Sequence, residues 1–480
     1  MGSTLNQGAT PAGVEILMNY DGIGLAELVK SGQVSPTELV EASIQAIEAL
    51  DGEINAIPMR NFEDALDRAS SIRRQGPFAG VPFSIKDTAN VAGLPSAMGN
   101  KFFAEQPPPT QSYGMVRLYE AAGLIVLGKT NTPELSLIPT TEGGVFGTNR
   151  NPWNLDHSAG GSSGGAAAAV AAGYMPVAHG TDGAGSIRIP GSHCGVFGFK
   201  AGRDRVFPGN TNPRFAFDHV LSRSVRDCAL SLAVTQDRSP EIPLEWMEYV
   251  QRPSARRLKI GFYCESYALS ATSEVKEAVL ATARLCQDLG HEVIETKQII
   301  ELEEYEKNYI ALFARTILAA RRTIEEATGK PIEESGLMNR FTIEFGNQAE
   351  DLTDEDFEAA ENYFLEWEQK FNNWMTPFDV FLTPVMYAPA PEHGFLVDES
   401  LDYEVMSRRI FDFVSFVTPM NVFGLPGMSV PLAWSMKGLP IGSHFFAKYG
   451  QEAMLLELAY ELEAEQPWAN KWAPNSIANL

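Results

Sequence analysis

Residues 160–191 read GGSSGGAAAAVAAGYMPVAHGTDGAGSIRIPG, and they carry more structural and chemical information than any other part of the chain. Two glycine-rich turns that contain serine, at 160–165 and 183–186, flank an alanine-rich segment that is expected to be helical. Glycine next to serine lets the backbone turn sharply and approach a ligand with its N–H groups pointing outward. Two such turns brought together would surround one small volume with hydroxyls and backbone donors, as acyl transfer requires.

Other interpretations of this stretch follow from the same residues. GGSSGG alone is typical of a flexible linker. Gly161, Ser163 and Gly165 fit the G-x-S-x-G nucleophile elbow, which would make Ser163 the nucleophile, although an elbow follows a buried strand and residues 151–157 are polar and turn-like. A phosphate-binding loop is disfavoured because the pattern G-x-x-x-x-G-K-S/T does not occur in this segment.

Taken whole, the stretch resembles the signature of the amidase signature family. The resemblance rests on many fixed positions spread over about thirty residues, which makes an accidental match improbable. The matching positions are Gly160, Ser162, Ser163, Gly165, Ala167, Gly180, Asp182, Ala184, Ser186, Ile187, Arg188 and Pro190. Weaker similarity to the family extends over residues 20–470, nearly the whole chain.

The resemblance implies a triad of two serines and a lysine, with the lysine upstream of the signature. Residues 78–88 read FAGVPFSIKDT and are similar to the family's G-x-P-x-x-x-K-D segment, which makes Lys86 the expected base. The same comparison makes Ser162, on a cis peptide bond, the proton relay and Ser186 the nucleophile. A lysine can accept a proton only when neutral, and burial among apolar strands lowers its pKa from about 10.4 toward the working range. Lys129, in a Gly-Lys-Thr setting, is a competing candidate.

The same resemblance assigns supporting roles around the second turn. The backbone N–H groups of Gly183, Ala184, Gly185 and Ser186 are expected to form an oxyanion hole. Four further residues are expected to support the site without reacting: Ser163, Thr181, Asp182 and Arg188. The resemblance implies no cofactor and no metal.

The fold implied by the resemblance is α/β, with a large twisted mixed β-sheet covered by helices on both faces. We expect a single amidase signature domain over residues 1–480, with an N-terminal arm at 1–20. Alternation of strand and helix patterns supports this class. The strands are expected near 78–88, 122–130, 257–264, 293–294, 379–386 and in the 424–442 region, and the helices at 24–49 (two), 273–289 and 451–464. The interrupted apolar region 411–434 reads as core strands and turns.

Two segments depart from the commoner family pattern. Residues 203–222 combine Phe207, Phe215, Phe217 and His219 with Pro, Gly and Asn, which suggests an ordered loop near the mouth of the pocket. Residues 301–376 are helical in pattern, acidic and rich in aromatics. They form either a pocket wall, fixed or moving as a lid, or a solvated helical layer.

Composition excludes several function classes. The formal net charge of −24 disfavours nucleic acid as a partner. Four scattered cysteines without C-x-x-C spacing are typical of free thiols in a reducing compartment. The seven histidines show no metal-ligand pair, and His179 and His193 bracket the Ser186 turn. The N-terminus lacks a secretory pattern and no apolar run is long enough for a membrane span, so we expect a cytoplasmic protein.

These features together predict an amide-bond hydrolase that acts through an acyl-enzyme. Within the family, the N-P-W-N-L, A-H-G-x-D-x-A-G-S-I-R-I-P and C-terminal P-W segments resemble 6-aminohexanoate cyclic dimer hydrolases, with aryl acylamidases and urethanases in the same branch. The expected partner is a small neutral amide, anilide, cyclic amide or carbamate, and the protein is a monomer or homodimer. The alternatives are a glutaminase-type subunit of a tRNA-dependent amidotransferase and a non-catalytic binding protein on the same fold.

Overall fold

The computed structural model describes residues 13–207, 215–238, 244–245 and 247–480. The expected N-terminal arm, 1–20, therefore falls partly outside the described residues, and so does part of the 203–222 loop. The helices are α1 Val14–Asn19, α2 Gly22–Ser31, α3 Pro36–Ile54, α4 Phe62–Ser71, α5 Lys101–Ala104, α6 Gly114–Ala121, α7 Gly164–Ala172, α8 Arg188–Cys194, α9 Val225–Thr235, α10 Ser273–Asp288, α11 Leu302–Thr328, α12 Ile332–Ser335, α13 Arg340–Asn347, α14 Asp354–Trp374, α15 Tyr403–Val414, α16 Pro419–Val422 and α17 Glu452–Glu465.

The strands are β1 Met59–Arg60, β2 Pro82–Lys86, β3 Ile125–Thr130, β4 Arg150–Asn151, β5 Asn154–Ser158, β6 Val177–Asp182, β7 Phe197–Lys200, β8 Phe217–Ser222, β9 Lys259–Phe262, β10 Glu292–Glu295, β11 Val380–Pro384, β12 Gly427–Trp434 and β13 Pro440–Ala447. Short 3-10 turns occupy Glu134–Ser136 and Ile477–Asn479.

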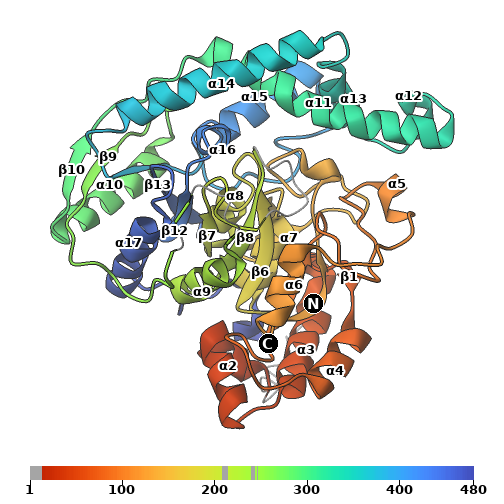
Figure 1. Ribbon diagram of the computed structural model, residues 1–480, viewed down its shortest axis with the longest axis vertical. Helices are drawn as coiled ribbons and strands as arrows, with labels where there is room; N and C mark the ends of the chain where they lie inside the picture. Colours follow the sequence, from red (N-terminus) through yellow and green to blue (C-terminus); the bar gives the residue numbers. More distant parts are fainter. Residues whose placement is uncertain (1–12, 208–214, 239–243, 246) are drawn as a thin grey trace, which may run out of the picture.

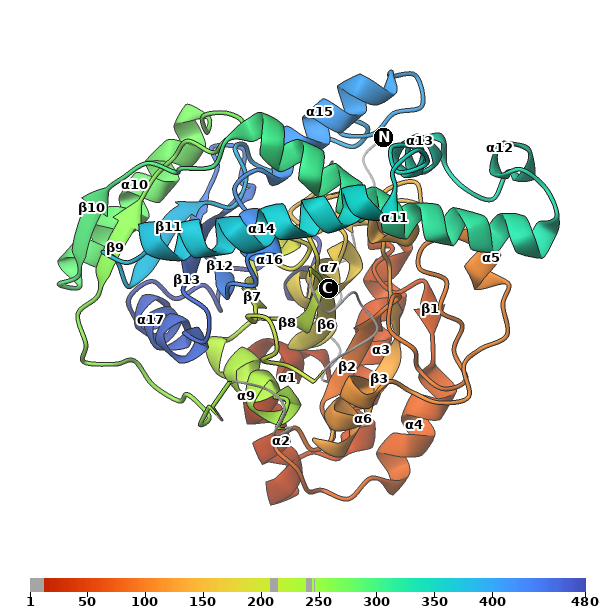
Figure 2. The ribbon, with the colours of Figure 1, turned by 45° about the horizontal axis from the view of Figure 1, so that its top comes forward.

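An eight-stranded mixed sheet in the order β10-β9-β11-β13-β12-β7-β8-β6 forms the centre of the molecule. Its first three strands run parallel, and each later neighbour in the order pairs antiparallel. A three-stranded sheet, β1-β3-β2, lies beside it, with β2 next to β6. Helices cover both faces, and the long helices α11 and α14 cross the top of the molecule (Figures 1 and 2). The expected mixed α/β fold with a large helix-covered sheet is confirmed.

Local sequence explains the elements that flank the site. α3 begins with a capping box, in which the Ser35 side chain accepts from the Glu38 N–H and the Glu38 carboxylate accepts from the Ser35 N–H. Alanine-rich α7 is buried along its whole length and ends at Gly173, whose φ of +84° suits a residue without Cβ. Small side chains let this helix lie close to β2, β3 and β6, which places its N-terminal turn at the centre of the fold.

One prediction about secondary structure is wrong. Residues 411–434 were expected to be strands and turns, but the first residues complete α15 and residues 419–422 form α16, before β12 begins at Gly427. Short apolar runs look alike in a buried helix and a buried strand, and here the hydrophobic positions from 406 to 414 belong to an amphipathic helix.

The close packing of α7 generates a stability prediction. A Cβ at Gly165 would lie 2.6 Å from the Ala56 carbonyl oxygen and closer still to the Asn131 nitrogen, so Gly165→Ala should destabilise the fold by about 1–3 kcal/mol. Gly52→Ala, in α3 with nothing within 4 Å of its added Cβ, is the matched control and should be neutral or stabilising by up to about 1 kcal/mol. Denaturant titration measures both, and equal stabilities would contradict this packing.

Candidate active site

Lys86 ends β2 with its side chain fully buried beneath the first serine turn. Its Nζ donates to Ser162 Oγ at 2.7 Å and to Thr181 Oγ1 at 2.8 Å. Thr181 belongs to β6, the strand beside β2, while Ser162 precedes α7. The fold therefore brings an amine from one sheet against two hydroxyls from other segments.

The surroundings of Lys86 favour its neutral form. Burial lowers the pKa of Lys86 to about 7, and the negative charges of Asp182 and Asp218 act in the opposite direction. Near pH 7 the lysine is thus divided between its charged and neutral forms, which is the range in which an amine can act as a general base.

The two serines of the first turn have different surroundings. The Gly161–Ser162 peptide bond is cis, as the family resemblance implies, and Ser162 faces the lysine. Ser163 Oγ instead donates to the Thr181 carbonyl oxygen at 3.0 Å and accepts from the Thr181 N–H at 3.2 Å. Ser163 thereby ties the turn to β6. It follows a polar two-stranded ribbon, not a buried strand of the main sheet, so the nucleophile-elbow interpretation lacks its structural context.

The Asp182 carboxylate holds the second serine turn in place through hydrogen bonds to its backbone. Its carboxylate accepts from the N–H groups of Gly185 at 2.7 Å and Ile187 at 3.2 Å. The Gly185 N–H is therefore committed to Asp182, which differs from its expected place in an oxyanion hole. In the described part of the chain, the N–H groups of Gly183, Ala184 and Ser186 have no backbone or side-chain acceptor.

Arg188 and Asp182 form a buried ion pair, with contacts of 2.9 and 3.0 Å. Although burial raises the pKa of Asp182, Arg188 holds it below its ordinary value. Two residues that the sequence did not mark complete this network. Asn421, in α16, accepts from Arg188 at 2.6 Å and donates to the Asp182 backbone oxygen at 2.8 Å, and His444 Nε2 lies 3.0 Å from Arg188 Nη1. Both are distant in sequence, and no local pattern identifies them.

Lys129, the competing lysine, has a different partner. It is fully buried, but its Nζ lies 2.8 Å from Asp87 Oδ1 and donates to the Pro95 carbonyl oxygen at 2.7 Å. Burial lowers the pKa of Lys129, but the carboxylate of Asp87 opposes that effect and favours the charged amine. The geometry therefore favours Lys86 over Lys129 as the base.

Ser162, Thr181 and Ser186 open into one apolar cavity of about 280 Å³. No hydrogen bond joins Ser162 Oγ to Ser186 Oγ within the described residues, but both side chains reach this cavity. Of the described residues that line it, none is charged. The lining consists of Thr88, Met98, Leu135, Ser136, Leu137, Ile138, Pro139, Ser162, Thr181, Gly183, Ala184, Ser186, Phe215, Ala216, Tyr309, Leu312, Phe313, Thr316, Ile317, Phe341, Phe345, Ile410, Phe411 and Val414.

The walls of this cavity differ in part from those expected. Phe215, from the 203–222 segment expected near the pocket mouth, contributes, and so do residues 135–139. Phe217 does not, because its ring packs under the Lys200 amine at 3.8 Å, and Phe207 packs against Gly114. A large part of the wall comes from α11 and α13, which lie within 301–376, and from α15.

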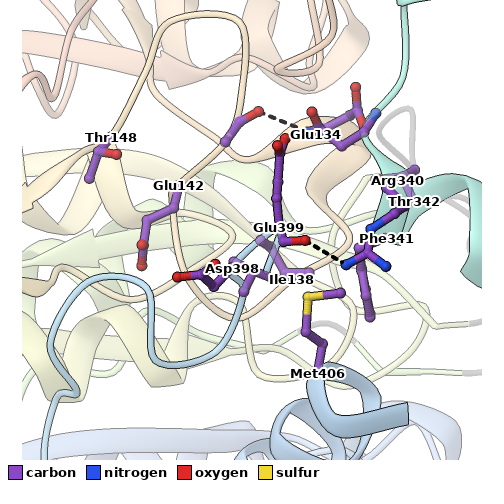
Figure 3. A pocket seen from close by; sticks show the side chains of 13 residues that line it. Glu134, Ile138, Glu142, Thr148, Arg340, Phe341, Thr342, Asp398, Glu399 and Met406 are labelled. Atoms are coloured by element: carbon purple, nitrogen blue, oxygen red, sulfur yellow. Dashed lines mark hydrogen bonds between the residues drawn. The ribbon is translucent and has the colours of Figure 1, made fainter. Parts of the chain in front are cut away.

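A second, polar cavity of about 210 Å³ adjoins the first, and Ile138 and Phe341 line both. Figure 3 shows carboxylate side chains around it, including Glu134, Glu142 and Asp398. It contains neither Lys86 nor the paired serines.

In the described ranges of the chain, no group of three or more His, Cys, Asp or Glu side chains is arranged to hold a metal ion. Nor does any helix in that part of the chain have the length and apolar character needed to cross a membrane.

Comparison with known proteins gives concordant matches. A model of the Amidase family matches residues 38–456. The chain is 33% identical to a 6-aminohexanoate-cyclic-dimer hydrolase of Pseudomonas sp. (strain NK87), covering 93% of this chain and 95% of that protein. A solved structure of a 6-aminohexanoate cyclic dimer hydrolase superposes with a TM-score of 0.88 at 33% identity, covering 95% of this chain and 99% of the other. A bacterial aryl acylamidase of the amidase signature enzymes gives a TM-score of 0.87 at 25% identity, covering 96% and 99%.

The network below the second serine turn predicts the effect of removing Asn421. Asn421→Ala leaves the Asp182 backbone oxygen and a buried guanidinium nitrogen each without one partner, so it should destabilise the fold by about 1–3 kcal/mol and lower the rate of hydrolysis. Asn308→Ala is the control, since Asn308 is only half-buried and its side chain donates to a carbonyl of its own helix. Thermal unfolding and kcat would be measured for both variants. Equal melting temperatures and equal kcat values for the two variants would refute the role of Asn421 in supporting the second serine turn.

Proposed function

Because the chain belongs to the amidase signature family, we propose that Ser186 is the nucleophile of its reaction, with Ser162 as the proton relay and Lys86 as the base. The chain is an amide hydrolase, as are its named relatives. The observation that carries the assignment of residues is the 2.7 Å contact between Lys86 Nζ and Ser162 Oγ, made at the edge of the cavity that also receives Ser186.

The proposed reaction begins with neutral Lys86. The Ser162 proton passes to Lys86 Nζ while Ser162 takes the proton of Ser186, whose Oγ bonds to the carbonyl carbon of the amide. The C–N bond then breaks, the proton returns through Ser162 to the leaving nitrogen, and an amine departs. Water attacks the acyl-Ser186 ester by the same relay and releases the carboxylic acid. Thr181, at 2.8 Å from Nζ, keeps the lysine aimed at the relay.

The N–H groups of Gly183, Ala184 and Ser186 are the proposed donors to the oxyanion. Their lack of other acceptors among the described residues supports this assignment. Gly185 is better assigned as a support residue, because its N–H holds the turn to Asp182. Donors fixed in advance stabilise developing charge without reorganising at the moment of reaction.

The substrate is proposed to be neutral and largely apolar. Isolated charges are costly to bury without partners, and the described lining of the catalytic cavity supplies none. Amides, anilides, cyclic amides and carbamates all meet this requirement. A glutaminase-type activity would require partners for an α-carboxylate and an α-amine, and the cavity offers only hydroxyls and backbone groups among its polar contacts.

The surrounding organisation is also proposed in outline. We interpret 301–376 as a wall of the substrate cavity within one domain, supported by Leu312, Phe313 and Phe345 in its lining. The four cysteines are free thiols, which supports a cytoplasmic location. A monomer or homodimer remains the proposed assembly.

Replacing the proposed nucleophile should abolish the reaction without disturbing the fold. Ser186→Ala should retain its far-ultraviolet spectrum and melting temperature but hydrolyse an anilide at less than about 1% of the original rate. A fluorophosphonate should add to Ser186 and not to Ser163, as peptide mass spectrometry can show. An adduct on Ser163 would transfer the role of nucleophile to that residue.

The pH profile should report Lys86. Because the base must be neutral and the pKa of Lys86 is lowered to about 7, kcat/KM should rise with pH and level off above that value. Lys86→Ala should be nearly inactive at every pH. A profile that is flat from pH 5 to 9, with chemistry rate-limiting, would be incompatible with a neutral lysine base.

Substrate preference should follow the uncharged cavity. We expect kcat/KM for a neutral anilide or carbamate to exceed that for glutamine by at least about 10²-fold, which corresponds to about 2.7 kcal/mol in transition-state binding. The two substrates are compared with one enzyme preparation in one buffer. Equal or better use of glutamine would favour the amidotransferase-type alternative.

A further inference from the structure

Two buried side chains, the imidazole of His179 and the carboxylate of Asp218, are linked to the backbone of Lys86 by hydrogen bonds. The Lys86 backbone N–H donates to His179 Nδ1 at 3.2 Å, and His179 Nε2 lies 3.1 Å from Asp218 Oδ1. His179 and Lys86 are fully buried, and Asp218 is 3% exposed. The three residues come from β6, β2 and β8, which lie together near the centre of the molecule (Figure 2).

The hydrogen bonds determine the tautomer of His179. Its Nδ1 accepts from an amide N–H and so carries no proton, which leaves the ring proton on Nε2, where it is donated to Asp218. The ring is thus held at both ends. Since β2 ends at Lys86, the bond from His179 fixes the backbone position from which the lysine side chain extends toward Ser162.

We propose that His179 and Asp218 are positioning residues for Lys86: His179 fixes the backbone of the lysine, and the charge of Asp218 limits how readily the buried amine loses its proton. This inference rests on the proposed role of Lys86 as base. Neither His179 nor Asp218 lines the catalytic cavity, so both act through the lysine.

Two negative charges act on the Lys86 amine. Burial lowers its pKa, and Asp182 and then Asp218 oppose that effect. Asp182 is held by the guanidinium of Arg188, and Asp218 is joined to the backbone of Lys86 through the imidazole of His179. Among the described residues, other titratable groups close by include the ion pair of Asp87 with Lys129, and Tyr119, whose ring lies 6.3 Å from that of His179. Tyr113 and His219 also lie close, since burial and then the charge of Asp218 raise the pKa of Tyr113, and burial and then His179 lower the pKa of His219.

The charge of Asp218 can be removed while its hydrogen bond is kept. Asp218→Asn retains an oxygen that accepts from His179, but the lost negative charge should lower the pKa of Lys86 and move the acid limb of kcat/KM to lower pH by at least about 0.5 unit. The plateau at high pH should change by less than about 3-fold, since an unchanged geometry leaves the neutral lysine as effective as before.

Glu463→Gln is the matched control. Burial raises the pKa of Glu463 to about 7, so this carboxylate titrates in the same range as Lys86, but it accepts from the Val225 N–H and does not face the lysine. Its replacement should leave the acid limb in place. An acid limb that moves with Glu463→Gln and not with Asp218→Asn would overturn the inference.

Two variants of His179 test positioning independently, including the case in which Asp218→Asn fails to fold. His179→Asn places an oxygen near the former Nδ1 and keeps an acceptor for the Lys86 N–H, whereas His179→Leu removes it. The leucine variant should lose at least about 10-fold in plateau kcat/KM, and the asparagine variant should recover most of that loss.

Equal plateaus in the two His179 variants, or an unmoved acid limb in folded Asp218→Asn, would overturn the inference. Lys86→Ala separates this failure from failure of the proposed function. If Lys86→Ala is inactive, the role of Lys86 stands and only the positioning pair is lost. If Lys86→Ala is active, the result contradicts both the proposed role of Lys86 as base and the positioning role of His179 and Asp218.

Discussion

The burial of the Lys86 amine without a carboxylate in direct contact is the constraint on which the rest of the structure depends. Lys86, Lys129 and Lys200 are all fully buried, but they satisfy their amines differently. Lys129 meets a carboxylate, and Lys200 donates to two backbone carbonyls and lies over an aromatic ring. Lys86 contacts two hydroxyls, which accept its hydrogen bonds without fixing its charge. Such surroundings allow Lys86 to lose its proton near pH 7 and to accept one from Ser162.

The second serine turn depends on a different buried interaction. Asp182 accepts from the backbone N–H groups of Gly185 and Ile187, and Arg188 compensates its charge. Asn421 and His444 then secure the guanidinium from α16 and β13. The turn is consequently supported from three elements before any substrate arrives, which is the rigidity that stabilisation of an oxyanion requires. The two hydroxyls that contact Lys86 and the second serine turn line the same cavity, although separate interactions hold them in place.

Much of this arrangement could be predicted because short sequence patterns specify it. Glycines mark both serine turns, alanines mark α7, and Lys86 lies in a short motif of its own. Long-range partners could not be predicted: Asn421 and His444 are more than two hundred residues from the groups they contact. The prediction that Phe217 lies near the pocket mouth, which rested on aromatic composition, is wrong. A strand residue beside the site can face a neighbouring lysine, here Lys200, and not the pocket. The sequence left open whether 301–376 lines the pocket, because only the packing of α11 in the folded chain brings its apolar side chains to the cavity.

Direct titration of the Lys86 amine tests the central claim, that this lysine is neutral when it reacts. The Lys86 Nζ resonance can be followed by NMR in Ser186→Ala protein labelled at lysine, with Lys86→Arg in the same background to assign it. We predict a midpoint near pH 7, well below that of the exposed lysines. A lysine that stays protonated to pH 9 or above would contradict a neutral-amine base.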